Sequence, residues 1–270
     1  MDAFVFNPIL LIKQCPDPSK GIGLFSLNKL SKGLRLLIEV PMLTHESKEE
    51  AVANIQFDFH SLPLAHQALY TRLFAGPTDV IPLMNVQPVR DLGSTDLTRL
   101  KTIMECNGME GQGLGCVLLF FGSLLNHSCV PNAWIYWNDT TGSMTLHALR
   151  EIDTGEEITI SYIQDSSDQR RDEMARLRGE LSAYYQRESS GQDDIYDAMA
   201  KLRRIAQLME NENLIGLELS LIYVEQAQLF DKLHDERGRR DKLRKAVQIR
   251  LLCLGADHPS SIDLALKLSS

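Results

Sequence analysis

The stretch Asn126-His127-Ser128-Cys129-Val130-Pro131-Asn132 decides the fold, together with a second stretch that follows it, Gly155-Glu156-Glu157-Ile158-Thr159-Ile160-Ser161-Tyr162. Each stretch alone is a weak local signal. A third stretch near the amino terminus, Lys20-Gly21-Ile22-Gly23-Leu24-Phe25-Ser26, places a pair of glycines on an expected strand. Glycine allows backbone conformations and close approaches that other residues forbid. Three such stretches in this order indicate one particular kind of fold.

Taken together, the three stretches resemble the signature of SET domains, the fold of most protein-lysine methyltransferases. The resemblance is to a fungal branch of these proteins, which has an inserted helical block and a helical carboxyl-terminal region. It implies the α+β class: a SET-domain β-rich core of short strands, a helical insertion and an α-helical carboxyl-terminal region.

Hydrophobic periodicity locates these parts along the chain. Gly21 to Leu27 and Leu34 to Val40 have the composition of strands and flank a turn. Residues 45–105 change to apolar positions at helical spacing, which indicates a helical insert. Short strands return between residues 106 and 163, with Asn138 to Gly142 as a hairpin turn.

From Ser166 onward the apolar positions follow a helical period. We expect two buried stripes, the first formed by Ile195, Met199, Leu202 and Ile205, and the second by Leu214, Leu217, Leu221 and Val224. We predict a SET domain at residues 1–165 with its helical insert at about 45–105, and an α-helical region at residues 166–270 that packs on the SET core.

Charge and hydropathy limit the partners. The chain has 28 Lys and Arg against 36 Asp and Glu, a formal net charge of −8. We therefore expect no nucleic acid partner, because phosphates would be repelled, whereas a lysine-rich substrate would be attracted. The basic run from Arg237 to Lys245 alternates with apolar residues, which favours a solvated helix face over a binding patch. No apolar run approaches the ~20 residues needed to cross a bilayer, so we expect no membrane partner.

Cysteine usage indicates the cellular setting. The five cysteines are scattered and include no Cys-x-x-Cys pair: Cys15, Cys106, Cys116, Cys129 and Cys253. This spacing argues against a disulfide framework or a self-contained zinc site, and we predict no bound metal. Because Met1-Asp2-Ala3-Phe4 also lacks the features of a secretory signal, we expect the protein in the cytoplasm or the nucleus.

The SET resemblance implies S-adenosylmethionine as the cofactor and transfer of its methyl group to a deprotonated amine. Such an in-line displacement depends mostly on positioning and on exclusion of water. The resemblance implies that the Asn126 amide and the His127 backbone hydrogen-bond the cofactor. Gly21 and Gly23 would let the main chain approach its methionine end. Tyr162 matches the family's tyrosine at the methyl-transfer point, where a phenol orients the amine.

One part of the family's pocket is missing from this chain. Relatives hold the pocket's roof with a zinc ion, bound by the motif cysteine and a later Cys-x-Cys-x-x-Cys segment. Here Cys129 is kept, but the next cysteine after Tyr162 is Cys253, so we expect Cys129 to be a buried hydrophobe. The helix at residues 170–188 would then hold the roof by packing. Tyr185 falls at the first lost zinc position, and we predict that Tyr185 or its neighbour Tyr184 stacks on the adenine of the cofactor.

The sequence leaves two functions open. The first is an S-adenosylmethionine-dependent N-methyltransferase that acts on a protein lysine. The alternative is a diverged SET fold that acts on a small-molecule metabolite, or a non-catalytic binding module whose helical carboxyl-terminal region docks a protein partner. Retention of Gly21, Gly23, Asn126 and Tyr162 favours the enzyme, and the lost cysteines favour divergence. Read without the family, Tyr162 is a buried ring with a wet hydroxyl.

Overall fold

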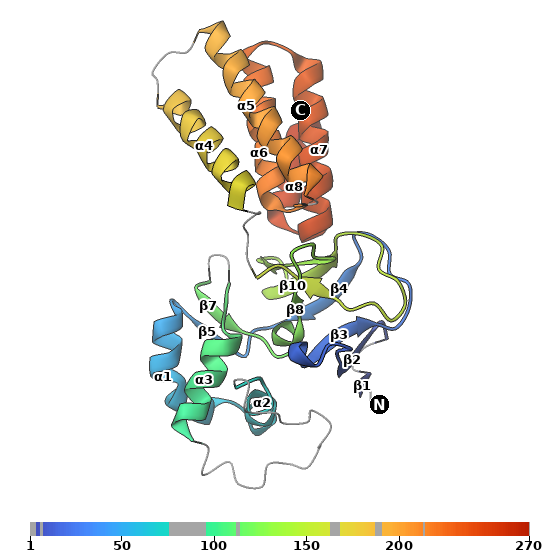
Figure 1. The fold of residues 1–270 in the computed structure, drawn as a ribbon, viewed down its shortest axis with the longest axis vertical. Helices are drawn as coiled ribbons and strands as arrows, with labels where there is room; N and C mark the ends of the chain where they lie inside the picture. The colour runs from blue at the N-terminus through green and yellow to red at the C-terminus, as the bar shows by residue number, and fades with distance from the viewer. Residues whose placement is uncertain are drawn as a thin grey trace.

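The computed structural model describes residues 4–5, 8–75, 96–111, 114–162, 168–186, 191–212 and 214–269. One part contains small sheets with helices inserted among them, and the other contains longer helices (Figure 1). The long helices gather at one end of the molecule, and the sheets and the insert occupy the other end. Among the described residues, no helix combines the length and apolarity that crossing a membrane requires.

Within the described residues, the strands form four small sheets. The first is antiparallel and contains β1 (Phe4–Val5), β2 (Leu10–Gln14) and β3 (Ile22–Ser26). The second has the order β4 (Arg35–Glu39), β10 (Ser143–Ala148) and β9 (Ala133–Asn138). The third has the order β5 (Leu43–His45), β7 (Cys116–Leu118) and β6 (Met109–Glu110). The fourth pairs β8 (Asn126–His127) with β11 (Thr159–Ile160) in parallel. Short 3-10 turns, η1 (Pro18–Lys20) and η3 (Gly122–Leu124), precede β3 and β8.

The β9–β10 hairpin is present where the sequence predicts it. The Thr140 backbone N–H donates to Asn138 Oδ1 over 2.9 Å, and Gly142 has a φ of 59°, which suits a residue without a Cβ. All six residues of β10 are buried. Because alternate side chains of a strand point to opposite faces, both faces of β10 are covered. Leu146 and Ala148 belong to the hydrophobic core of the sheets, and α7 (Glu236–Leu254) contacts β10.

The predicted helical insert is formed by α1 (Lys48–Ser61), α2 (Leu64–Tyr70) and α3 (Leu97–Asn107). Ser47 caps α1, because its hydroxyl accepts the Glu50 backbone N–H over 3.1 Å. Ile55 and Phe59 are spaced by one helical turn and are fully buried. The Tyr70 hydroxyl donates to the Leu100 carbonyl over 2.7 Å, which joins α2 to α3. The insert therefore shares one core with the sheets.

The carboxyl-terminal helices are α4 (Asp168–Tyr185), α5 (Gln192–Asn211), α6 (Leu217–Lys232), α7 and α8 (Pro259–Ser269). The first predicted stripe, on α5, is buried as expected. The second prediction is wrong in detail, because Leu221 is 50% exposed, and Leu219, Ile222 and Tyr223 are buried instead. α6 packs against both α5 and α7, so two faces of α6 are apolar and the sequence pattern alone does not single out the buried one.

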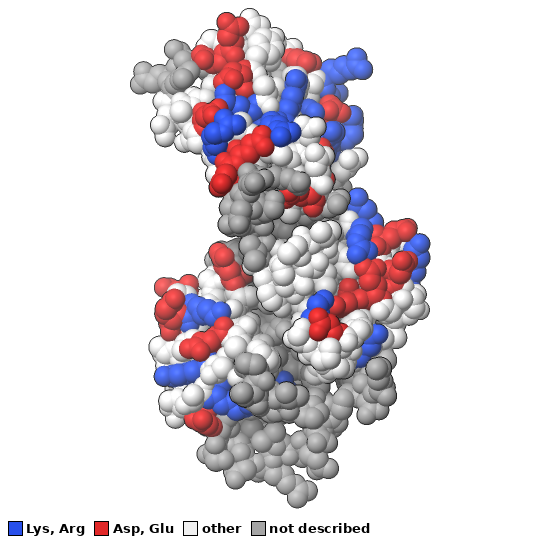
Figure 2. Space-filling model, in the orientation of Figure 1, with Lys and Arg blue, Asp and Glu red and all other residues white. Residues whose placement is uncertain are grey.

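Charged side chains of both signs are interleaved over the helical end of the molecule (Figure 2). In the basic run, Arg239 and Arg240 both pair with Glu236, and Lys242 pairs with Asp241. Arg240 and Glu236 are each about half exposed. These pairs fit the interpretation of the run as a solvated helix face.

The helical end is joined to the sheets by the turn between α7 and α8. The Arg35 guanidinium pairs with the Asp257 carboxylate, and Asn138 Nδ2 donates to the same carboxylate over 3.3 Å. His258 accepts the Ser260 backbone N–H at Nδ1, so its Nε2 holds the proton that reaches the Trp137 carbonyl at 3.1 Å. α7 also contacts β9 and β10. The domain boundary near residues 165 and 166 stays a prediction.

Candidate functional site

The three sequence stretches meet at one place in the first part of the molecule. Asn126 pairs with Thr159 across the parallel β8–β11 ladder. The Ile158 backbone N–H donates to the Leu24 carbonyl over 2.7 Å, and Ser26 N–H donates to the Glu156 carbonyl over 2.9 Å. Segments that are far apart in the sequence are therefore held together by main-chain hydrogen bonds.

The Asn126 amide is directed at a carboxylate that the sequence analysis did not single out. Its Nδ2 donates to Glu157 Oε1 over 2.8 Å and to the Ile22 carbonyl over 3.3 Å. Among the described residues, no donor reaches its Oδ1, so an acceptor atom stays available for a ligand. The site therefore keeps Asn126 in a fixed orientation with one unused polar atom.

Gly23 is required by close packing. A Cβ at this position would lie 3.0 Å from each of three atoms, Asn126 Nδ2, Cys15 Sγ and Glu157 Oε1. Gly21 differs, because its φ is 65° and a Cβ there would meet no heavy atom within 4 Å. Gly21 therefore presents bare backbone to open space, in a left-handed conformation that L side chains rarely adopt. A ligand can approach the main chain closely at this position.

Glu157 is the centre of a polar cluster beside these glycines. Lys20 Nζ lies 3.1 Å from Glu157 Oε2, and the Glu157 side chain is only 16% exposed. The Cys15 thiol donates to Glu157 Oε1 over 3.4 Å. Burial, together with the charge of Glu157, raises the pKa of Cys15 to about 12. The hydrogen bond to Glu157 raises the pKa of Lys20, so the lysine stays an ammonium.

Asn132 fixes the motif loop to β11 and to the Glu157 main chain just before it. The residue is 1% exposed. Its Nδ2 donates to the Glu157 carbonyl over 2.7 Å, and its Oδ1 accepts the Thr159 backbone N–H over 2.8 Å. A side-chain amide is suited to this position because it both donates and accepts. Asn132 is part of the quoted motif. Its role as a link to β11 could be recognised only once the position of that strand was known.

Tyr162 and His127 lie side by side at the end of the parallel pair. The Tyr162 hydroxyl donates to the Leu125 carbonyl over 2.5 Å, and its backbone N–H donates to His127 Nδ1 over 3.0 Å. The two ring centroids are 5.4 Å apart. Although the residue is 62% exposed, desolvation, and secondarily the charge of Glu157, raises the pKa of the Tyr162 phenol. The phenol is therefore neutral at physiological pH.

Cys129 does not have the predicted environment. The expectation of a buried hydrophobe is wrong, because Cys129 is exposed. His127 accepts at Nδ1, so its other ring nitrogen carries the proton when the ring is neutral, and this Nε2 lies 3.4 Å from Cys129 Sγ. The loop of residues 128–131 follows β8, and the sequence pattern does not show that Cys129 and Val130 in it are exposed.

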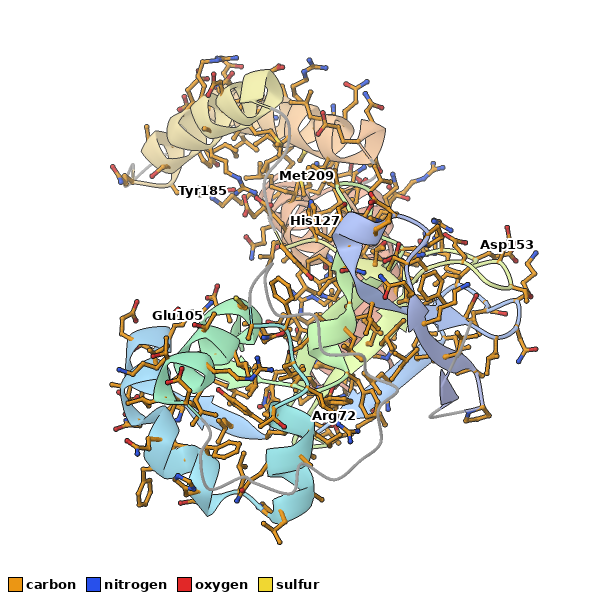
Figure 3. All side chains as sticks on the ribbon, turned by 60° about the horizontal axis from the view of Figure 1, so that its bottom comes forward. Arg72, Glu105, His127, Asp153, Tyr185 and Met209 are labelled. Atoms are coloured by element: carbon orange, nitrogen blue, oxygen red, sulfur yellow. The ribbon has the colours of Figure 1, made fainter. Side chains whose placement is uncertain are left out.

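Tyr185 lies apart from the other predicted site residues. It is the last residue of α4, which rises away from the sheets (Figure 1). An α-helix of 18 residues is about 27 Å long. The Tyr185 hydroxyl donates to Glu225 Oε2 over 3.2 Å, and Figure 3 places Tyr185 on the helical part and His127 on the sheets. The structure thus brings together Gly21, Gly23, Asn126, His127 and Tyr162, and the adenine contact of Tyr185 stays a prediction.

Tyr184, the other candidate for that contact, is 7% exposed and belongs to the core of the helical part. Lys232 Nζ lies 5.4 Å from the centroid of its ring.

In the part of the chain that the structure describes, no group of three or more His, Cys, Asp or Glu side chains is arranged to hold a metal ion. The prediction that the protein binds no metal stays a prediction.

The comparisons with known proteins identify the family. The SET domain model matches residues 21–163, more than half of the chain. The chain therefore belongs to the SET domain family, and the predicted α+β class with a SET core and helical regions is confirmed. All five site residues that the structure brings together lie within the matched range.

Two curated relatives are similar over part of their length. The histone-lysine N-methyltransferase set5 of Schizosaccharomyces pombe is 30% identical over 154 residues, which are 57% of this chain and 42% of set5. The histone-lysine N-methyltransferase SMYD3 of mouse is 44% identical over 71 residues, 26% of this chain and 16% of SMYD3. The chain thus spans less than half the length of these relatives. They come from different kingdoms, and the fungal origin inferred from the sequence stays a prediction.

The solved structures are less similar to this chain than the curated relatives are in sequence. The SET domain of LSMT bound to lysine and AdoHcy has a TM-score of 0.35 and 10% identity, with 99% of this chain and 88% of that chain covered. An active polycomb repressive complex 2 in the stimulated state has a TM-score of 0.35 and 13% identity, with 99% and 34% covered. Both scores are below 0.5, and the family assignment rests on the sequence match.

Proposed function

We propose that this protein is an S-adenosylmethionine-dependent methyltransferase that acts on an amine, and that the amine is a protein lysine side chain. The observation that supports it most is the convergence of Gly21, Asn126 and Tyr162 on one site, held by the β8–β11 pair. The curated relatives set5 and SMYD3 are named histone-lysine N-methyltransferases, which favours lysine as the substrate.

The residues present fit the amino acid end of the cofactor. Lys20 and Glu157 supply one ammonium and one carboxylate, side by side next to Gly21. A zwitterionic α-amino acid group carries the complementary pair of charges, and hydrogen bonds to charged groups are the strong ones. The bare backbone at Gly21 has room for it. Asn126 Oδ1 would accept from the ligand's ammonium or adenine donors. When bound, the cofactor supplies a methyl group on a sulfonium.

Tyr162 has the chemistry to receive the substrate amine. Its hydroxyl proton is directed to the Leu125 carbonyl, so the oxygen lone pairs are left to accept an N–H of the incoming amine. The lysine must be neutral to attack, and a site of low polarity lowers its pKa. The amine's lone pair would form the new C–N bond as the C–S bond of the sulfonium breaks; the neutral thioether S-adenosylhomocysteine would leave, and the new ammonium would lose one proton to water. The contribution of the site would be alignment of the amine with the methyl group.

One observation favours the second candidate function, a non-catalytic SET fold. The donors of the Asn126 amide are already used by the protein's own groups, Glu157, the Ile22 carbonyl and Cys15. In that case the polar cluster would be a structural core, and the helical region would be the interaction surface. A diverged enzyme for a small-molecule amine is the remaining alternative.

Calorimetric titration with S-adenosylmethionine and S-adenosylhomocysteine separates these functions. The enzyme predicts micromolar binding, about −8 kcal/mol, and transfer of radioactive methyl to a lysine-containing histone peptide but not to its arginine-substituted version. Binding with transfer only to small amines would replace the protein substrate by a metabolite. An absence of heat at about millimolar ligand would leave the non-catalytic function.

We further propose an intracellular location, the cytoplasm or the nucleus. The support is that the five cysteines are all unpaired, as is usual for proteins in reducing compartments. We also propose that the helical carboxyl-terminal region binds a protein partner. Fractionation of cells with a tagged full-length protein tests the location, and its recovery in the secreted fraction would contradict it.

A further inference from the structure

A cavity lies away from the candidate site, where the first part of the molecule meets the helices. Its volume is about 570 Å³, within the range of about 300–1,000 Å³ that small-molecule sites occupy. One wall is the turn of Lys32 and Gly33 that precedes β4, and the other walls come from α5, α6 and α7. Gly33 N–H donates to the Ala148 carbonyl over 2.8 Å, so this wall is fixed to β10.

The floor of the cavity is apolar. It is formed by Ile215, Leu219, Tyr223, Ile249 and Leu252. Leu219 is 2%, Tyr223 3% and Leu252 8% exposed. These side chains belong to packed clusters, so the floor is preformed and does not require rearrangement. A ligand with an apolar body would cover the apolar surface that the floor still exposes.

The rim carries two ammonium groups. Lys32 and Lys245 are exposed and line the cavity, and neither has a carboxylate partner among the described residues. Lys245 Nζ lies 5.2 Å from the centroid of the Tyr223 ring, which holds this cation over the floor. The one carboxylate of the lining, Glu210, already accepts the Tyr223 hydroxyl. Glu210 keeps its negative charge, so two ammonium groups against one carboxylate leave the lining with a net positive charge.

We propose that this cavity binds a small amphipathic carboxylate, whose apolar chain covers the floor and whose carboxylate is held by Lys32 and Lys245. The apolar floor and the net positive charge of the lining together define this chemistry, because a charged head without a chain would leave the floor bare. Lys32 belongs to the first part and Lys245 to the helices. A bound carboxylate would therefore tie the two parts together and stabilise the protein. The site is distinct from the proposed methyl-transfer site and does not depend on it.

The test is isothermal titration with dodecanoate below its micelle concentration, with the uncharged alcohol and the quaternary ammonium of the same chain length as comparisons. We expect micromolar binding of dodecanoate, and affinities at least about tenfold weaker for the other two.

The double variant Lys32→Gln/Lys245→Gln should weaken dodecanoate binding by about tenfold or more. Both lysines are exposed, so an unchanged melting temperature without ligand will verify folding. Lys48→Gln, an exposed lysine on α1, is the matched control.

Four outcomes would overturn the proposal, and the first three concern dodecanoate and its analogues. They are no heat at about millimolar dodecanoate, equal affinity for the quaternary ammonium, and unchanged affinity in the double variant. A fourth is displacement of dodecanoate by a short acidic peptide that binds more tightly, which would assign the groove to a protein partner. Because S-adenosylmethionine is absent from the titration, none of these outcomes bears on methyl transfer.

Discussion

Asn126 Nδ2 donates to Glu157 Oε1 over 2.8 Å, although the two residues belong to different sequence motifs. This hydrogen bond sets the orientation of the asparagine amide and fixes the carboxylate that pairs with Lys20. One contact therefore joins the two long motifs to the glycine stretch. The same contact explains why a change at any of the three would disturb the others.

Glu157→Gln should weaken S-adenosylhomocysteine binding by about tenfold. The substitution keeps the size of the side chain but removes the charge that Lys20 pairs with, and a hydrogen bond to a charged group contributes about 1.5–3 kcal/mol. Calorimetry measures the affinity. Glu151→Gln is the matched control, because Glu151 pairs with Lys29 at an exposed position, 2.9 Å apart. Equal affinities for both variants would remove Glu157 from the cofactor site.

Gly23→Ala should destabilise the protein by about 1–3 kcal/mol, because overpacking of a core forces neighbours to move. The new Cβ would lie 3.0 Å from atoms of Asn126, Cys15 and Glu157. Gly179→Ala is the control, since it lies on α4 with no heavy atom within 4 Å, and should stabilise by about 0.5–1 kcal/mol. Urea unfolding of both variants measures the difference. A Gly23 variant as stable as the native protein would contradict this packing.

Asn132→Ala should cost about 3 kcal/mol of unfolding free energy. It leaves the Thr159 N–H and the Glu157 carbonyl without their partner, and each unsatisfied buried group costs about 1–3 kcal/mol. Asn211→Ala, at the exposed end of α5, should change stability by less than about 0.5 kcal/mol. Similar unfolding midpoints for the two variants would show that the loop is not held by Asn132.

The free energy of unfolding should decrease as the pH is lowered, because His147 is buried in its neutral form. Burial, and secondarily the charge of Arg35, lowers the pKa of His147 from 6.5 to about 4. The unfolded chain therefore binds this proton first, so stability is full above about pH 6.5 and is lost as the pH falls toward 4. We expect a loss of up to about 2 kcal/mol between pH 7 and 4.5. His147→Gln keeps an acceptor for Arg35 Nε and should flatten this slope, as urea unfolding at several pH values will show. An unchanged slope would mean that other groups cause it.

Tyr162→Phe should reduce methyl transfer by about a hundredfold and leave cofactor affinity unchanged. The phenol is the group proposed to accept the amine N–H, and the ring itself is kept by the substitution. Single-turnover rates and calorimetry measure the two effects separately. Tyr196→Phe, a 54% exposed tyrosine on α5, should change neither. If the two variants are equally active, Tyr162 has no part in the reaction.

The predicted hairpin and the helical insert are present because local patterns encode them. The turn at Asn138 to Gly142 and the helix cap at Ser47 are formed by neighbours in the sequence. The placement of Leu221 could not be predicted in the same way, because α6 has helices on more than one side. The exposure of Cys129 depends on how a short loop leaves the sheet, which residue type does not determine.

By itself, the sequence determined the family and the order of strands and helices, and it pointed to five residues that the structure brings together, because these follow from motif spacing and from periods of two and 3.6 residues. Only the tertiary structure decided that Glu157 joins Lys20, Cys15 and Asn126, and that Tyr185, the last residue of α4, contacts Glu225 of α6. It also decided that two lysines from distant segments border one cavity. Contacts of this kind depend on how separate elements pack, and spacing along the chain carries no record of that packing.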